Sequence, residues 1–166
     1  MRSLYSLTTM RSLIIVGLPA SGKTSHARSV LAGRSHYEDI HHWLYHRDQS
    51  IKEGNDLFGR FLDDLQAGRP FVIDSVEMCE RTVREHFVGK YLSHLREIDW
   101  LYFENEPEQC RHNAYLPEHR GEGHRAHRLR EIDRASRVYH IPEGANVRAV
   151  YCPPTSKVVP ASSDRT

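Results

Sequence analysis

One stretch of eight residues constrains this chain more than any other: residues 17–24, with the sequence GLPASGKT, directly after the apolar run LIIV at 13–16. It matches the pattern Gly-x4-Gly-Lys-Ser/Thr at every constrained position. Such a loop binds a phosphate because successive backbone N–H groups turn inward around the anion, and a side chain at Gly17 or Gly22 would obstruct that turn. A glycine-rich turn without a ligand is the alternative. We favour phosphate binding because strand, full motif and helix come in register.

The two residues that close the motif carry its chemistry. Lys23 would place a positive charge on the β- and γ-phosphates of a nucleoside triphosphate, and Thr24 would supply a hydroxyl ligand for Mg²⁺. The helix that begins near residue 22 directs the positive end of its dipole at the same anion. The predicted nucleotide-binding residues of this stretch are Gly17, Pro19, Ala20, Ser21, Gly22, Lys23, Thr24 and Ser25.

The rest of the chain predicts one α/β domain. Apolar runs alternate with amphipathic stretches, so we expect a three-layer fold with a parallel five-stranded sheet and helices on both faces. The expected strands are 13–16, 35–39, 71–75, 98–103 and 146–151, and the expected helices are 22–31, 57–65, 80–96, 107–116 and 131–140. We place the domain at residues 12–152, after an N-terminal extension at 1–11 and before a tail at 153–166 that lacks periodicity and is expected to be poorly ordered.

Composition sets further bounds. With 166 residues, 23 basic and 22 acidic side chains, the global charge gives no reason to expect a nucleic-acid or membrane partner. Cys79, Cys110 and Cys152 are far apart and odd in number, which favours reduced thiols, and the first two are expected to be buried small residues. No run is as long as a membrane span and the first ten residues lack a secretory core, so we expect a cytoplasmic protein.

Two expected strands end in acidic residues. Ligands collect at the carboxyl ends of strands in a parallel sheet, so Glu38 or Asp39 is a candidate general base, although Asp39 would serve equally as a helix cap. Asp74 ends the strand at 71–75, where a carboxylate could assist the ion that Thr24 contacts, usually through water. A turn-forming role for Asp74 is the alternative.

Residues 111–130 break the alternating pattern. Five arginines surround Pro117 and the GEG sequence at 121–123, namely Arg111, Arg120, Arg125, Arg128 and Arg130. A basic, glycine-hinged segment could close over a phosphoryl group as a lid and exclude water. An exposed pair of basic helices is the alternative, and it is favoured for any single arginine.

Histidines cluster twice, at 41, 42 and 46 and at 119, 124 and 127. A structural zinc site is disfavoured because neither group has a nearby cysteine pair at standard spacing. A regulatory GTPase is disfavoured as well, because Asn-Lys-x-Asp is absent and the Asp-x-x-Gly match at 56–59 does not follow a strand.

With these residues in place, the chain resembles small P-loop kinases of the polynucleotide kinase group over roughly residues 12–151. The resemblance implies ATP and Mg²⁺ as cofactors and makes Asp39 the general base that takes a proton from the acceptor hydroxyl. The lid arginine on the ATP phosphates best matches Arg120, with Arg111 and Arg125 as alternatives in register. Where the family carries an arginine for the acceptor phosphate, this chain has His42, which leaves the acceptor open.

Within that group, residues 139–142, Tyr-His-Ile-Pro, look most like bacteriophage kinases that phosphorylate 5-hydroxymethyl-deoxyuridine in DNA. The resemblance therefore implies DNA as the substrate and, for a phage protein, the host cytoplasm as its location. The alternatives are a 5′-hydroxyl polynucleotide kinase, a nucleoside or nucleotide kinase, and a zeta-toxin-like or nucleotide-gated binding protein.

The mechanism expected from the sequence combines these residues. Lys23, Asp39 and Arg120 are the candidate catalytic residues, and Thr24 and Asp74 are the candidate metal ligands. His42 and Trp43 are candidate substrate contacts, and Trp43 could stack on a base. A core position for Trp43 is the favoured alternative, and the sequence leaves the oligomeric state open.

Overall fold

The computed structural model describes residues 10–38, 40–45, 56–95, 97–116 and 122–153. Its five parallel strands lie in the order β2-β3-β1-β4-β5, which confirms the predicted fold class. They are β1 (Ser12–Val16), β2 (Ser35–Glu38), β3 (Phe71–Ser75), β4 (Ile98–Phe103) and β5 (Val147–Arg148). The strand at the centre, β1, leads directly into the phosphate loop.

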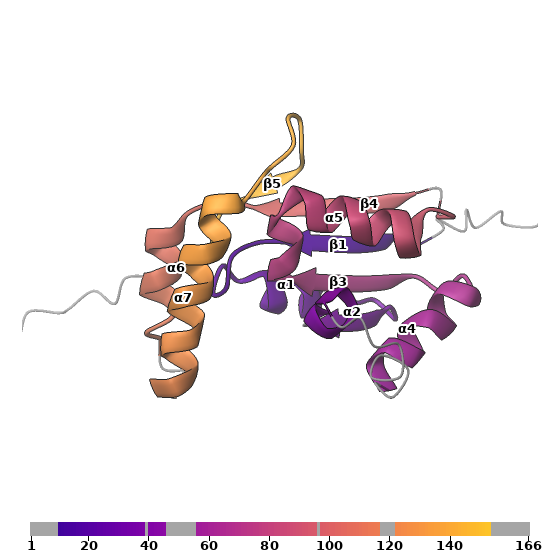
Figure 1. The fold of residues 1–166 in the computed structure, drawn as a ribbon, viewed down its shortest axis with the longest axis horizontal. Helices are drawn as coiled ribbons and strands as arrows, with labels where there is room; N and C mark the ends of the chain where they lie inside the picture. Colours follow the sequence, from indigo (N-terminus) through magenta and orange to yellow (C-terminus); the bar gives the residue numbers. More distant parts are fainter. Residues whose placement is uncertain (1–9, 39, 46–55, 96, 117–121, 154–166) are drawn as a thin grey trace, which may run out of the picture.

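The helices connect these strands and extend beyond them. Figure 1 shows α6 and α7 side by side beyond the carboxyl ends of the strands. The α-helices are α1 (Lys23–Ser29), α2 (His41–Tyr45), α4 (Asp56–Gln66), α5 (Arg81–Phe87), α6 (Pro107–Asn113) and α7 (Glu122–Val138). Two short helices, the 3₁₀ helix η1 (Val76–Cys79) and the π-helix η2 (Val88–Leu92), flank α5. None of the described helices is long and apolar enough to cross a membrane.

Strand side chains alternate between two cores, as the two-residue period of a strand requires. Ile14 and Val16 of β1 pack into the larger core, and Ile15 packs with Ala27 of α1 into the smaller one. The larger core contains a cluster of aromatic rings, in which Trp43 stacks on Phe61 with ring centroids 4.9 Å apart. The sheet is therefore the middle of three layers.

The buried face of α4 does not follow its apolar residues alone. Leu57 and Leu62 are 44% and 37% exposed, whereas Asp64 is 5% exposed. Asp64 is buried because it accepts hydrogen bonds from Tyr37 Oη at 2.6 Å and from Arg69 Nε at 2.6 Å. Burial and the hydrogen bond to Asp64 raise the pKa of Tyr37 to about 12. The apolar period could not show that a carboxylate with two donors occupies the inner face.

Several helix boundaries were also wrong. The single helix predicted at 80–96 is two elements, α5 and η2, and the 3₁₀ helix η1 precedes it. Arg84 is buried in α5 because it donates to the carbonyl oxygens of Met78 and Cys79, at 2.6 and 3.1 Å. The helix predicted at 131–140 begins earlier, at Glu122, and continues through Gly123. Residues 122–130 of the expected lid are therefore part of α7. Residues 1–9 of the extension expected at 1–11, and residues 154–166 of the tail expected at 153–166, lie outside the described residues.

The cysteines are as predicted for buried small residues. Cys79 and Cys110 are free thiols with no exposed surface, and burial raises the pKa of both to about 12. Neither thiol can act as a nucleophile near neutral pH.

Candidate active site

The phosphate loop between β1 and α1 has the tight geometry that its glycines were predicted to provide. Gly22 has φ of +95°, and a Cβ there would lie 2.9 Å from Tyr151 Cβ. A Cβ on Gly17 would lie 2.8 Å from Ser21 Oγ and 3.0 Å from Phe103 Cβ. A side chain at either position would therefore force the loop to move.

Two distant segments hold the loop in place. Asn113, 1% exposed at the end of α6, donates from Nδ2 to Ala20 O at 3.0 Å and to Tyr151 O at 2.7 Å. The Tyr151 backbone N–H in turn donates to Ser21 O at 2.9 Å. The loop is thus fixed between α6 and the segment after β5, which preorganises it for an anion. Sequence analysis missed Asn113 and Tyr151, because nothing local marks a residue that supports a loop more than 90 positions away.

The two predicted metal ligands meet directly. Thr24 Oγ1 donates to Asp74 Oδ2 at 2.5 Å, and Asp74 Oδ1 lies 2.7 Å from His36 Nε2. Asp74 is 2% exposed at the end of β3. Hydroxyl and carboxylate oxygens are the ligands that Mg²⁺ prefers, so this pair fits the ion that the motif implies. His36 holds the Asp74 carboxylate from the side away from Thr24, a contact that sequence analysis missed.

Two cavities meet at the phosphate loop. We call the first, of about 850 Å³, the Tyr151 cavity; its lining includes Ser25, His26 and the segment 148–151. We call the second, of about 790 Å³, the Glu77 cavity; its lining includes Glu38, Asp74 and α7. Four residues line both cavities: Pro19, Lys23, Thr24 and Arg128. Two cationic residues, Lys23 and Arg128, therefore line both cavities.

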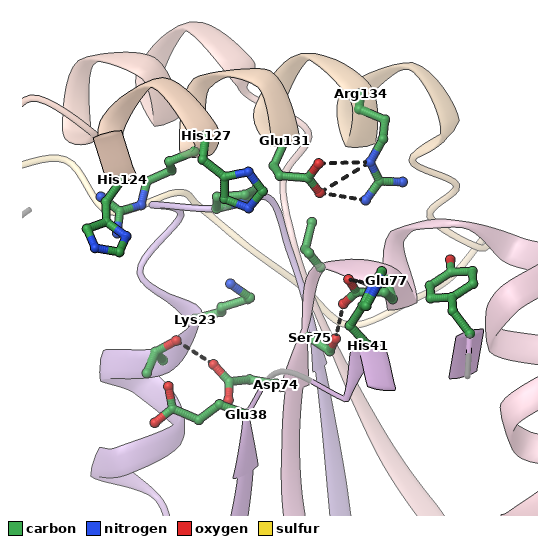
Figure 2. Close-up of a pocket in the computed structure, with 15 residues that line it drawn as sticks. Lys23, Glu38, His41, Asp74, Ser75, Glu77, His124, His127, Glu131 and Arg134 are labelled. Atoms are coloured by element: carbon green, nitrogen blue, oxygen red, sulfur yellow. Dashed lines mark hydrogen bonds and ion pairs between the residues drawn. The ribbon is translucent and has the colours of Figure 1, made fainter. Parts of the chain in front are cut away.

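The wall of the Glu77 cavity is strongly charged. Figure 2 shows Lys23, Glu38 and Asp74 below α7. Glu77 and His41 lie to their right, and Glu131 and Arg134 lie above, on α7. Arg134 Nη2 pairs with Glu131 Oε2 at 2.7 Å, and this hydrogen bond lowers the pKa of Glu131. Glu38 pairs with Arg28 at 2.9 Å. The wall can bind polar groups of both signs.

Several predicted site residues lie outside the described residues or away from the two cavities. Asp39, Arg120 and the side chain of His42 are outside the described part of the chain. Arg111 pairs with Asp133 at 2.7 Å and with Glu108, and the Arg125 guanidinium lies 5.0 Å from the Tyr115 ring centroid. Neither of these two arginines is among the described residues that line the two cavities.

Trp43 is a correction among the substrate contacts. It is 2% exposed, stacked on Phe61 and tilted against Phe58 in the larger core. A base cannot stack on a ring whose faces are already covered, so the core alternative applies.

Sequence analysis also missed the face of α7 that lines the Glu77 cavity. Its residues recur at spacings of three and four: His124, His127, Arg128, Glu131 and Arg134. Residues 111–130 were interpreted from the sequence as a glycine-hinged lid and were not tested for this helical period. Arg128 is the described arginine that joins both cavities, and its buried Nη1 has no hydrogen-bond partner among the described residues.

The comparison with solved structures bears on the fold. No family model and no curated protein matches the sequence. An unliganded sugar kinase from Janibacter sp. HTCC2649 is similar over 85% of this chain and 84% of its own, with 17% identity and a TM-score of 0.53. A gluconokinase from Sinorhizobium meliloti 1021 is similar over 86% and 84%, with 15% identity and a TM-score of 0.49. The chain has the α/β fold of P-loop kinases; identities this low leave the acceptor to be argued from the site itself.

Proposed function

We propose that this protein is an ATP-dependent kinase that transfers the γ-phosphate to a hydroxyl of a nucleic acid, specifically the 5-hydroxymethyl group of 5-hydroxymethyluracil in DNA. One observation carries the proposal of a kinase: the phosphate loop separates two cavities that share Lys23, Thr24 and Arg128. A phosphotransferase needs a donor and an acceptor on opposite sides of the migrating group, with positive charge between them.

The nucleotide is assigned to the Tyr151 cavity. Loop N–H groups and the amino end of α1 bind its phosphates, and Lys23 neutralises the β- and γ-phosphates. Arg128 takes the lid role that the sequence resemblance gave to Arg120, because its guanidinium borders both cavities. Arg120 stays a candidate for the same role.

A bound Mg²⁺ would supply positive charge that neutralises the charge developing on the phosphates during transfer. Thr24 would hold it directly and Asp74 through water, with His36 keeping the Asp74 carboxylate in place. We assign no further step to the ion.

A carboxylate after β2 is proposed to bind the acceptor hydroxyl. Asp39 remains our candidate base, and its neighbour Glu38 lines the Glu77 cavity. A primary alcohol is barely acidic, so proton removal comes late and positioning contributes more than basicity.

The charge of the Glu77 cavity distinguishes between acceptors. Its wall carries both carboxylates and cations, and a phosphate placed beside Glu77, which has no arginine or lysine partner among the described residues, would meet repulsion from that carboxylate. A 5′ end brings a phosphodiester next to the reacting hydroxyl, whereas a flipped base presents a neutral ring. This favours a hydroxymethylated base over a 5′-hydroxyl. A free nucleoside would fit the same wall and is the second candidate; weak salt dependence of substrate binding would favour it.

Two substitutions test the kinase assignment. Lys23→Ala is expected to abolish transfer and to weaken ATP binding strongly, whereas Asp39→Asn should abolish transfer with ATP binding nearly unchanged. Lys90→Ala is the matched control, because Lys90 is exposed on η2 over the Tyr91 ring and lines neither cavity. Normal transfer by Asp39→Asn would remove Asp39 from the mechanism, and Glu38→Gln would then identify the alternative base.

A further inference from the structure

A buried acidic residue that the mechanism above does not use lies in the wall of the Glu77 cavity. Glu77 is 7% exposed, and it is in η1, three positions after Asp74. A buried carboxylate is costly unless hydrogen bonds satisfy it. Here Ser75 Oγ donates to Oε2 at 2.5 Å, and His41 Nδ1 lies 3.3 Å from Oε1. These two contacts fix the orientation of the carboxylate toward the cavity.

The carboxylate still has capacity to accept. An ionised carboxylate has about four acceptor positions, and the two contacts described occupy one on each oxygen. Glu77 can therefore take a further N–H or O–H from a ligand in the cavity. A phosphate beside Glu77 would be repelled by this carboxylate. A cationic ligand would face Lys23, Arg128 and Arg134, which line the same cavity. A neutral donor suits this wall best.

The surface beside Glu77 carries two aromatic rings, whose planes are tilted by 42°. The rings of His41 and Tyr45 lie with centroids 4.6 Å apart, and both residues line the cavity. Planar ligands pack well against such surfaces. In 5-hydroxymethyluracil, the N3–H donor and the 5-hydroxymethyl group project from different edges of one planar ring. A base whose N3–H contacts Glu77 can therefore direct its hydroxymethyl group elsewhere in the cavity, toward Lys23 and Thr24.

We infer that Glu77, held by Ser75 and His41, recognises the acceptor by accepting a hydrogen bond from the ring N3–H of a uracil-type base. This inference rests on the proposed function, since it names the group that selects the substrate of the same site. It makes Glu77 a specificity residue, distinct from the proposed base Asp39 and from the metal ligands.

The test is a binding measurement that needs no turnover. Calorimetry would compare 5-hydroxymethyl-2′-deoxyuridine with its N3-methyl derivative, on the protein loaded with a non-hydrolysable ATP analogue. A hydrogen bond to a charged group predicts roughly 10- to 150-fold weaker binding of the methylated nucleoside. Equal binding of the two nucleosides, or binding of neither, would overturn the inference.

A variant gives the same test from the protein side. Glu77→Gln keeps an oxygen for the Ser75 hydroxyl, so the fold should persist, but it loses the charge; nucleoside binding is expected to weaken about tenfold or more. Glu85→Gln is the control, because Glu85 pairs with the exposed Arg81 at 2.7 Å and lines neither cavity. Unchanged binding by Glu77→Gln would contradict the inference.

Phosphoryl transfer separates this inference from the proposed function. N3–H-dependent binding without transfer to any hydroxymethyl group would keep the role of Glu77 and refute the kinase assignment. If transfer to the N3-methyl base and transfer by Glu77→Gln both equal transfer by the wild type to the unmethylated base, the kinase assignment stands and the role of Glu77 is refuted.

Discussion

Gly22→Ala offers a quantitative test of the loop geometry. The substitution has two costs. A non-glycine residue in the left-handed region costs about 1–2 kcal/mol, and Gly22 has φ of +95°. The new Cβ would also lie 2.9 Å from Tyr151 Cβ, and relieving such a contact costs about 1–3 kcal/mol. The expected loss of unfolding free energy is therefore about 2–5 kcal/mol.

Gly68→Ala isolates the first cost. Gly68 has φ of +63°, and a Cβ there would meet nothing within 4 Å. Urea unfolding of both variants should show that Gly22→Ala loses about 1–3 kcal/mol more than Gly68→Ala. Only Gly22→Ala should also weaken ATP binding, since Gly68 is remote from the phosphate loop.

The identity of the clashing atom allows a stricter check. The contact is with Tyr151 Cβ, which alanine keeps and glycine lacks. Adding Tyr151→Ala to Gly22→Ala should therefore restore little unfolding free energy. Adding Tyr151→Gly should make the double variant more stable than the sum of the two single effects predicts. Equal losses in Gly22→Ala and Gly68→Ala, with ATP binding intact, would refute the claim that loop and C-terminal segment are packed this tightly.

Two further substitutions address charge at the site. Asp74→Asn keeps the shape of the side chain but loses its charge, so the Mg²⁺ concentration for half-maximal activity should rise roughly 10- to 100-fold, and an unchanged Mg²⁺ titration would argue against Asp74 as a metal-associated group. Arg128→Ala should lower kcat about 10³-fold or more, with a smaller change in KM for ATP. Arg137→Ala is the control, because Arg137 is exposed in the last turn of α7. Equal activity of the two variants would refute the lid role of Arg128.

The sequence predicted the fold well because its main determinants are local. The apolar runs of β1, β3 and β4 and the motif that follows β1 each need only neighbouring residues to be recognised. The parallel direction of the strands then follows from repeated strand–helix units. The proximity of Thr24 and Asp74 was predictable for the same reason, since Thr24 comes shortly after β1 and Asp74 lies near the end of β3, the parallel strand beside it.

What the sequence could not supply depends on distant contacts. Asn113 has its role because Ala20 and Tyr151 meet beside it, and Asp64 is buried because Tyr37 and Arg69 donate to it. No periodicity encodes such pairings. Glu77 was missed differently: a single acid after a strand looks like a solvated turn residue until burial and a facing cavity are known.

The most direct measurement is transfer of labelled γ-phosphate from ATP to a matched panel: DNA with 5-hydroxymethyluracil, ordinary DNA with free 5′-hydroxyls, RNA, and free nucleosides or nucleotides, each assayed with the wild type and Lys23→Ala. We expect label on hydroxymethylated DNA alone, lost in Lys23→Ala. Label on 5′ ends, or only on monomers, would show that the acceptor is that group and not the hydroxymethylated base. Label on none of them would contradict the kinase assignment.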